Sequence, residues 1–127
     1  GKPLIAYSIE TAQRFAVKHN GKVTLSTDSL EIKNVAEAFG LKTEYVRPES
    51  LAGDRVGKID TIRDIILYQE KVDSCRYDYI LDLDVTSPLR TIADLEESLK
   101  MLQNDSKAVT LFSVSPANRN PYFNMVQ

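Results

Sequence analysis

Apolar residues follow helical spacing in four stretches of the chain, and short apolar runs lie between these stretches. In each helical stretch they fall three or four positions apart. The four stretches begin near Pro3, Asp28, Ile59 and Thr91. The shorter runs are typical of strands and cover residues 23–26, 43–46, 79–83 and 108–114. This alternation predicts an α/β fold, a Rossmann-like three-layer arrangement with a mainly parallel sheet.

Residues with special backbone preferences mark the expected helix ends. Pro3 suits the first turn of a helix, because the N–H group there has no partner within the helix. Asn20-Gly21 and Gly40 are expected to end the first two helices, since Gly tolerates left-handed backbone. Asp28 is expected to cap the second helix, with Glu31 three residues later in an acidic variant of the capping box. The third helix is expected to turn an isoleucine face inward: Ile59, Ile62, Ile65 and Ile66.

Composition narrows the class of protein. The chain has 127 residues, which suits one domain, and its net charge of −2 gives no support for a nucleic-acid partner. No apolar run approaches the length of a membrane span, so no membrane partner is expected. Cys75 is the single cysteine, which excludes an internal disulfide and fits a cytoplasmic protein.

Two acids lie at the end of the apolar run 79–83. Asp82 and Asp84 are two positions apart on the predicted strand, so they point to the same face. Carboxylate oxygens suit Mg²⁺, and the pair resembles a divalent-metal site beside a phosphorylated ligand. The alternative is that Asp84 caps the following turn while Asp82 pairs with a Lys or Arg of a helix.

Three loops follow three predicted strands, at 27–28, 47–57 and 84–90. Because the carboxyl ends of parallel strands meet at one edge of a sheet, these loops are expected to lie together. Each loop also runs into a helix N-terminus, which favours anions such as the phosphates of a nucleotide.

Two arginines in these loops are candidate anion ligands. The Arg47 guanidinium could hold a phosphate or carboxylate through two parallel hydrogen bonds, or it could pair with Glu49 or Asp54. Arg90 could bind an anion or could tie down its own loop. Both alternatives stay open at this point.

Several short motifs, in order and with matching gaps, resemble the acylneuraminate cytidylyltransferases, the CMP-sialic acid synthetase group. The resemblance runs along nearly the whole chain and rests on five segments: Gly1 to Ile9, Val23 to Ser29, Arg47 to Asp54, Thr86 to Arg90, and Asn120 to Tyr122. It implies transfer of CMP from CTP to a sialic-acid-like, nine-carbon 2-keto sugar acid, with release of pyrophosphate and with Mg²⁺ as cofactor.

The resemblance also implies roles for individual residues but names no catalytic residue. The residues implied in nucleotide binding are Arg47, Asp54, Lys58, Thr86 and Ser87. Asp84 is implied in binding the sugar acid. Arg90 as a second sugar-acid ligand, and Asp84 with Asp82 as metal ligands, are candidates from their own positions, since the acids that the family usually assigns to Mg²⁺ belong to a later part. The partners expected are therefore CTP and the sugar acid, in a homo-oligomer.

Against the family pattern, the chain is expected to be a partial nucleotidyltransferase domain over residues 1–127. The family's first strand and nucleotide loop should precede Gly1, and a sugar-binding and dimerisation part should follow, so the chain alone is expected to be inactive. One rival interpretation is a non-catalytic nucleotide-binding or regulatory domain. Another is a different nucleotide-sugar enzyme, such as a sugar-1-phosphate nucleotidyltransferase.

Overall fold

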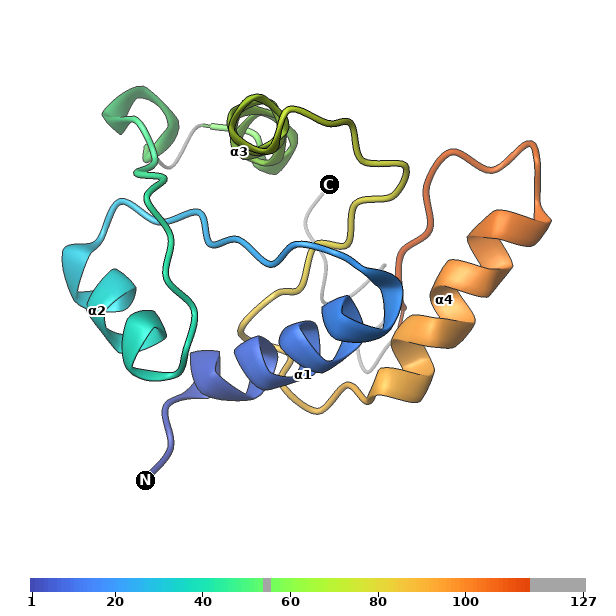
Figure 1. Cartoon of the computed structure of the whole chain (residues 1–127), viewed down its shortest axis with the longest axis horizontal. Coiled ribbons are helices and arrows are strands. Elements are labelled where there is room, and N and C mark those ends of the chain that lie inside the picture. Colours follow the sequence, from blue (N-terminus) through green and yellow to red (C-terminus); the bar gives the residue numbers. More distant parts are fainter. Residues whose placement is uncertain (54–55, 115–127) are drawn as a thin grey trace, which may run out of the picture. The chain divides into compact units, whose positions relative to one another are not determined.

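The computed structural model describes residues 1–53 and 56–114, and these contain four α-helices and one short 3₁₀ helix (Figure 1). The helices are α1 (Leu4–His19), α2 (Leu30–Ala38), α3 (Lys58–Asp73) and α4 (Ile92–Asn104), and the 3₁₀ helix η1 covers Glu49–Leu51. The chain divides into two compact units, Gly1–Ile92 and Ala93–Gln127. Among the described helices, none combines the length and apolar character that a membrane crossing requires.

The end of α1 and the start of α2 lie close to the predicted positions, with different residues as caps. Asn20, rather than Gly21, takes the left-handed conformation after α1, at φ 50°, and its N–H donates to the Ala16 carbonyl. Ser29, rather than Asp28, is the N-cap of α2, and its Oγ accepts a hydrogen bond of 3.3 Å from the N–H of Ile32. Both differences have a known physical basis. Asn adopts left-handed backbone readily, and Ser is as good an N-cap as Asp.

Gly40 and the isoleucines of α3 test two further expectations. Gly40 follows α2 with φ +81°, so a left-handed glycine ends this helix as predicted. In α3, Ile65 is buried and Ile62 and Ile66 are half-buried, but Ile59 is 74% exposed. The inward face of α3 is therefore shorter than the sequence pattern predicts.

A small apolar core lies in the first unit. Helix α1 packs against α2. The core joins Ile9 of α1, Ala36 of α2 and Leu41, which follows α2. Half-buried apolar side chains pack around it: Ile5, Val23, Leu25 and Phe39. Because Val23 and Leu25 come from a predicted strand, this segment contributes side chains to the core although it is not part of a sheet.

The predicted Rossmann-like fold, with its mainly parallel sheet and a missing first strand, is wrong for the described residues. These contain no strand, and the segments between the helices are drawn as plain tube in the coloured part of Figure 1. A single backbone hydrogen bond joins segments 23–27 and 43–47 there, from the Arg47 N–H to the Thr27 carbonyl at 3.1 Å. A strand requires a ladder of such bonds, and an apolar run specifies burial without specifying a partner.

The unit that begins at Ala93 contains most of α4. Within the residues described here, Leu95 is the buried apolar residue of α4, and the Ser98 hydroxyl donates to the Asp94 carbonyl one turn earlier at 2.7 Å. Phe112 and Val114, in the last predicted strand, are 77% and 83% exposed. In the described part of this unit, Phe112 and Val114 are therefore not covered by a local apolar core.

Candidate functional site

Arg47 is held by a serine from a different segment of the chain. Its Nε donates to Ser26 Oγ at 3.0 Å, and its Nη2 donates to the Ser26 carbonyl at 2.6 Å. The backbone N–H of Arg47 also bonds to Thr27. The guanidinium is thus oriented by residues 21 positions earlier, and not by Glu49, one of the local partners suggested by the sequence. The other suggested partner, Asp54, lies outside the described residues.

A buried tyrosine attaches this part of the site to α3. Tyr45 is only 3% exposed, and its hydroxyl donates to Asp64 Oδ2 at 2.6 Å. Burial, with the Asp64 carboxylate as second cause, raises the pKa of Tyr45 to about 12, so the phenol stays protonated at neutral pH. Its ring also meets Tyr68 edge to face, with centroids 5.2 Å apart. The segment carrying Arg47 is therefore fixed to α3 two residues before the arginine.

Lys58, in the first turn of α3, lies between the two acids of the Asp82/Asp84 pair. Its Nζ is 2.6 Å from Asp82 Oδ2 and 3.7 Å from Asp84 Oδ2. The hydrogen bond that Lys58 Nζ donates to Asp82 is the main cause that raises the pKa of Lys58, and the nearby Asp84 charge adds to it. Asp82 thus pairs with a helix lysine, which was the structural alternative to a metal role.

Asp84 organises the turn that follows it. Its Oδ1 accepts hydrogen bonds from the Thr86 N–H at 2.9 Å and the Thr86 hydroxyl at 2.7 Å. These bonds, and next the Lys58 ammonium, hold the pKa of the Asp84 carboxyl below its usual range. Arg90 Nη2 donates to the Asp84 carbonyl at 2.6 Å, and the Ser87 N–H donates to the same oxygen at 3.3 Å. Arg90 therefore ties down its own loop.

Helix α3 brings the two groups of polar residues near each other. It carries Lys58, which contacts Asp82 and Asp84, and Asp64, which contacts Tyr45. Asp64 lies six positions after Lys58, which corresponds to about 9 Å along a helix axis. The N-terminal half of α3 thus supports both the Arg47 segment and the Asp84–Arg90 turn, although no sheet edge gathers them.

The acidic pair is the best-formed cation position among these residues. Two carboxylate oxygens, Asp82 Oδ2 and Asp84 Oδ2, already face one cation, the Lys58 ammonium. Mg²⁺ is commonly held by one or two protein carboxylates together with substrate phosphates, so the pair fits such an ion. No cluster of three or more His, Cys, Asp or Glu side chains suited to a metal occurs in the residues described. A metal here would therefore depend on ligand oxygens as well.

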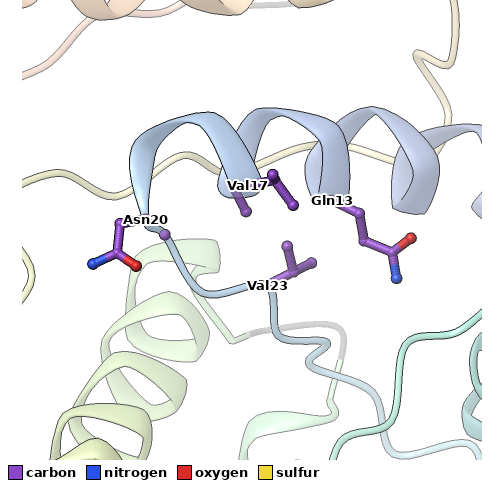
Figure 2. A pocket seen from close by; sticks show the side chains of 6 residues that line it. Gln13, Val17, Asn20 and Val23 are labelled. Atoms are coloured by element: carbon purple, nitrogen blue, oxygen red, sulfur yellow. The ribbon is translucent and has the colours of Figure 1, made fainter.

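A shallow hollow of about 470 Å³ lies elsewhere, beside the end of α1 (Figure 2). Val17 and Val23 face each other across it, and Gln13 and Asn20 lie at its ends. The Gln13 side-chain amide donates to the Gly40 carbonyl at 3.0 Å, so this polar group serves the fold. None of the site residues named above lines this hollow, and none of its lining residues is charged.

Three residues of the site carry no signal in the sequence pattern: Ser26, Tyr45 and Asp64. Each lies inside a predicted element, and each partner is distant in the chain, 21 positions from Ser26 to Arg47 and 19 from Tyr45 to Asp64. Among the sequence-predicted residues, Asp54 lies outside the described part, as does the Asn120 to Tyr122 motif. The structure brings Lys58 to Asp82 and Asp84, and it brings Thr86, Ser87 and Arg90 around the Asp84 turn.

The chain is similar to cytidylyltransferases along almost its full length. The cytidylyltransferase family model matches residues 1–124. A post-translational flagellin modification protein B from Campylobacter coli is 38% identical over 128 residues, covering 98% of this chain and 52% of that protein. A CMP-N,N'-diacetyllegionaminic acid synthase from Campylobacter jejuni is 37% identical over 98% of this chain and 52% of its own length. A pseudaminic acid cytidylyltransferase from the same species is 34% identical, over 98% and 53%.

The chain thus spans about half the length of these curated relatives. The family match, in contrast, covers nearly every residue of the chain, including all of the segments that carry Arg47, Lys58 and the Asp84–Arg90 turn. On this match, the chain belongs to the cytidylyltransferase family.

Proposed function

We propose that the protein carrying this chain transfers CMP from CTP to a nine-carbon 2-keto sugar acid of the sialic, legionaminic or pseudaminic type and releases pyrophosphate. The observation that carries this proposal is the family match over residues 1–124, together with relatives named for legionaminic and pseudaminic acids. The reaction needs a nucleotide, an acceptor acid and a means to offset phosphate charge.

In this proposal the oriented Arg47 guanidinium binds an anionic group of the nucleotide. Two of the five N–H donors of the guanidinium bond to Ser26. The other donors suit a phosphate or a carbonyl oxygen of the ligand. Thr86 and Ser87 present the turn that faces the nucleotide, and Asp84 and Arg90 shape that turn beside the sugar acid. Asp54 belongs to the same proposed nucleotide side.

We further propose Mg²⁺ as cofactor, held by Asp82 and Asp84 together with phosphate oxygens of CTP. Two observations support it: both carboxylates face one cation, and their partner Lys58 is a flexible side chain that is 59% exposed. When bound, the ion would offset negative charge on the phosphates. Lys58 is then available to contact a phosphate itself, as expected for a nucleotide-binding residue.

A cytoplasmic location and a homo-oligomeric state belong to the same proposal. A reaction that consumes CTP requires the cytoplasmic nucleotide pool, and Cys75 as a single exposed cysteine suits a reducing compartment. Light scattering on the purified natural protein tests the oligomeric state, and a monomer at assay concentration would contradict it.

The test of the activity uses the full-length natural protein that contains this chain. It is incubated with CTP, Mg²⁺ and N-acetylneuraminic, legionaminic or pseudaminic acid, and pyrophosphate and the CMP-sugar are measured. UTP, GTP and ATP serve as controls for the nucleotide. A CMP-sugar formed from CTP with at least one acid supports the proposal. Saturable CTP binding without product from any acid would contradict transfer and favour a nucleotide-binding domain without chemistry.

A further inference from the structure

Ser26 supplies both hydrogen-bond acceptors that orient the Arg47 guanidinium. The hydroxyl accepts from Nε at 3.0 Å and the backbone carbonyl accepts from Nη2 at 2.6 Å. Two bonds to adjacent donors fix the plane of a guanidinium as well as its position, because the fork of N–H groups is rigid. One bond alone would leave the group free to rotate.

The acceptors are themselves held in place. Next to Ser26, Thr27 is 5% exposed, its carbonyl accepts from the Arg47 N–H, and its Oγ1 accepts from the Ser29 N–H at 3.1 Å. On the other side, Tyr45 is anchored to α3 through Asp64. The arginine is therefore fixed at both its backbone and its side chain by residues with partners of their own.

This arrangement should raise the affinity of Arg47 for a ligand, because a free arginine side chain loses rotamer freedom when it binds. Ordering a flexible side chain costs about 0.5–1.5 kcal/mol of affinity. A guanidinium that is oriented before the ligand arrives has already lost that freedom during folding. The donors that do not bond to Ser26 can then meet an anion without further ordering.

We propose that Ser26 is a positioning residue that holds Arg47 in its ligand-binding orientation. The proposal rests on the function proposed above, in which Arg47 binds an anionic group of CTP. Ser26 itself makes no contact with the nucleotide in this proposal. Its hydroxyl is therefore expected to affect nucleotide affinity and not the rate of the chemical step.

The kinetic test compares Ser26→Ala with a matched control in the full-length natural protein. Ser8→Ala is the control, because the Ser8 hydroxyl is buried and has no hydrogen-bond partner among the described residues. Losing one neutral acceptor should raise the KM for CTP by about two- to tenfold and change kcat by less than about twofold. Ser26→Thr keeps the hydroxyl and should restore the KM. Ser8→Ala should leave both parameters near their wild-type values.

A double variant tests whether Ser26 acts through Arg47. Lysine has no Nε–H donor in the same place, so Ser26→Ala should add little to the effect of Arg47→Lys if the two residues act together. Independent effects that multiply would overturn the proposal. An unchanged KM in Ser26→Ala, or a fall in kcat with constant KM, would overturn it as well.

An NMR measurement decides the contact without any ligand. The Arg47 Nε–H resonance should be protected from solvent exchange in the wild type and in Ser8→Ala, and should lose that protection in Ser26→Ala. An Arg47 Nε–H signal insensitive to Ser26→Ala would disprove the positioning role. If the wild type fails to bind CTP while this signal behaves as expected, the proposed function fails and the Ser26–Arg47 contact stands.

Discussion

Replacing Tyr45 by Phe removes one hydrogen bond and leaves the rest of the side chain in place. The lost bond runs from the phenol to Asp64 Oδ2 at 2.6 Å. Phe keeps the buried ring and its edge-to-face contact with Tyr68. The substitution therefore tests the attachment of segment 43–47 to α3, with the Ser26 side chain as a second polar neighbour of the lost hydroxyl.

The expected loss follows from the type of bond. A hydrogen bond to a charged acceptor contributes about 1.5–3 kcal/mol to the free energy of unfolding, about twice as much as a neutral one. Tyr45 is 3% exposed, so its own hydroxyl is shielded from water, while its acceptor Asp64 is half-buried. We expect Tyr45→Phe to lower the free energy of unfolding by about 2 kcal/mol.

Urea unfolding followed by far-ultraviolet circular dichroism measures this loss. With a slope of about 2 kcal/mol per molar urea, the midpoint should fall by about 1 M at unchanged slope. Tyr7→Phe is the matched control, because Tyr7 on α1 is 44% exposed and its hydroxyl can be hydrated. Surface changes of this kind usually stay within about 0.5 kcal/mol.

The pH dependence gives an independent test of the same group. Tyr45 has a folded-state pKa raised to about 12 from 10.0. A raised pKa stabilises the folded state at pH below the unfolded value, and this contribution is lost as the pH rises from about 10 through about 12. Tyr45→Phe should lack that part of the alkaline decline. A midpoint equal to that of Tyr7→Phe, with the alkaline decline intact, would refute the reasoning.

Three further variants test the site and its supports. Thr86→Ala should raise the pKa of Asp84 by more than Lys58→Met does, because the Thr86 hydrogen bond is the largest cause of the lowered pKa. Carboxyl-carbon NMR measures this pKa, and a larger effect of Lys58→Met would contradict this order. In the wild type, the stability that the lowered Asp84 pKa gives to the turn should be lost as the pH falls below about 4. Ser29→Ala should remove the N-cap of α2 and cost about 1 kcal/mol of unfolding free energy, and a thermal midpoint equal to that of wild type would refute the cap. Asp82→Asn should weaken CTP binding with Mg²⁺ present and strengthen it with Mg²⁺ removed; calorimetry showing the same change in both conditions would argue against a metal at this pair.

The helices could be predicted from the sequence, because helical periodicity is a local signal. Each predicted helix is present, and α1 runs from Leu4 to His19 where the pattern placed its ends near Pro3 and Asn20. Cap residues shifted by one position, as with Ser29 in place of Asp28. Such shifts are expected, since neighbouring Ser, Asp and Asn compete for one cap.

The sheet was predicted incorrectly because strand formation depends on partners that a single segment does not specify. The run Tyr79 to Leu83 has the apolar character of a buried strand, yet Tyr79, Ile80 and Leu81 are 42%, 48% and 37% exposed. In segment 23–27, Val23 and Leu25 pack against the core formed by Ile9, Ala36 and Leu41 without strand hydrogen bonds. Burial and pairing are therefore separate requirements, and the apolar pattern guarantees neither, since Val23 and Leu25 pack on the core without a sheet and Tyr79 to Leu81 are exposed.

Local contacts of the site were predictable, and distant ones only as a kind of partner, as with Asp82, for which a helix Lys or Arg was one alternative and Lys58 is the partner. The sequence offered a turn-capping role for Asp84 and a loop-tying role for Arg90 as alternatives, and the structure shows both contacts within six residues of chain. The partner of Arg47 could not be found by spacing, because Ser26 lies 21 positions away, and the motif Val23 to Ser29 that contains it does not indicate which arginine it meets. Only a residue's neighbours in space identify it as a support for a binding group.

Under the proposed function, the charges near Asp82 and Asp84 affect which form of the nucleotide binds. Asp82 and Asp84 share one ammonium, so the cluster with Lys58 keeps an excess negative charge. A phosphate about 4 Å away would be repelled by about 4 kcal/mol per unit charge at an effective dielectric constant near 20. That is about half of the 8 kcal/mol or so of a micromolar affinity, against which Arg47 and Arg90, the latter bonded to the Asp84 carbonyl, each supply one positive charge. If the proposed function holds, the Asp82/Asp84 pair should favour a nucleotide that arrives with its own cation over the free triphosphate, which is why Asp82→Asn should have opposite effects with and without Mg²⁺.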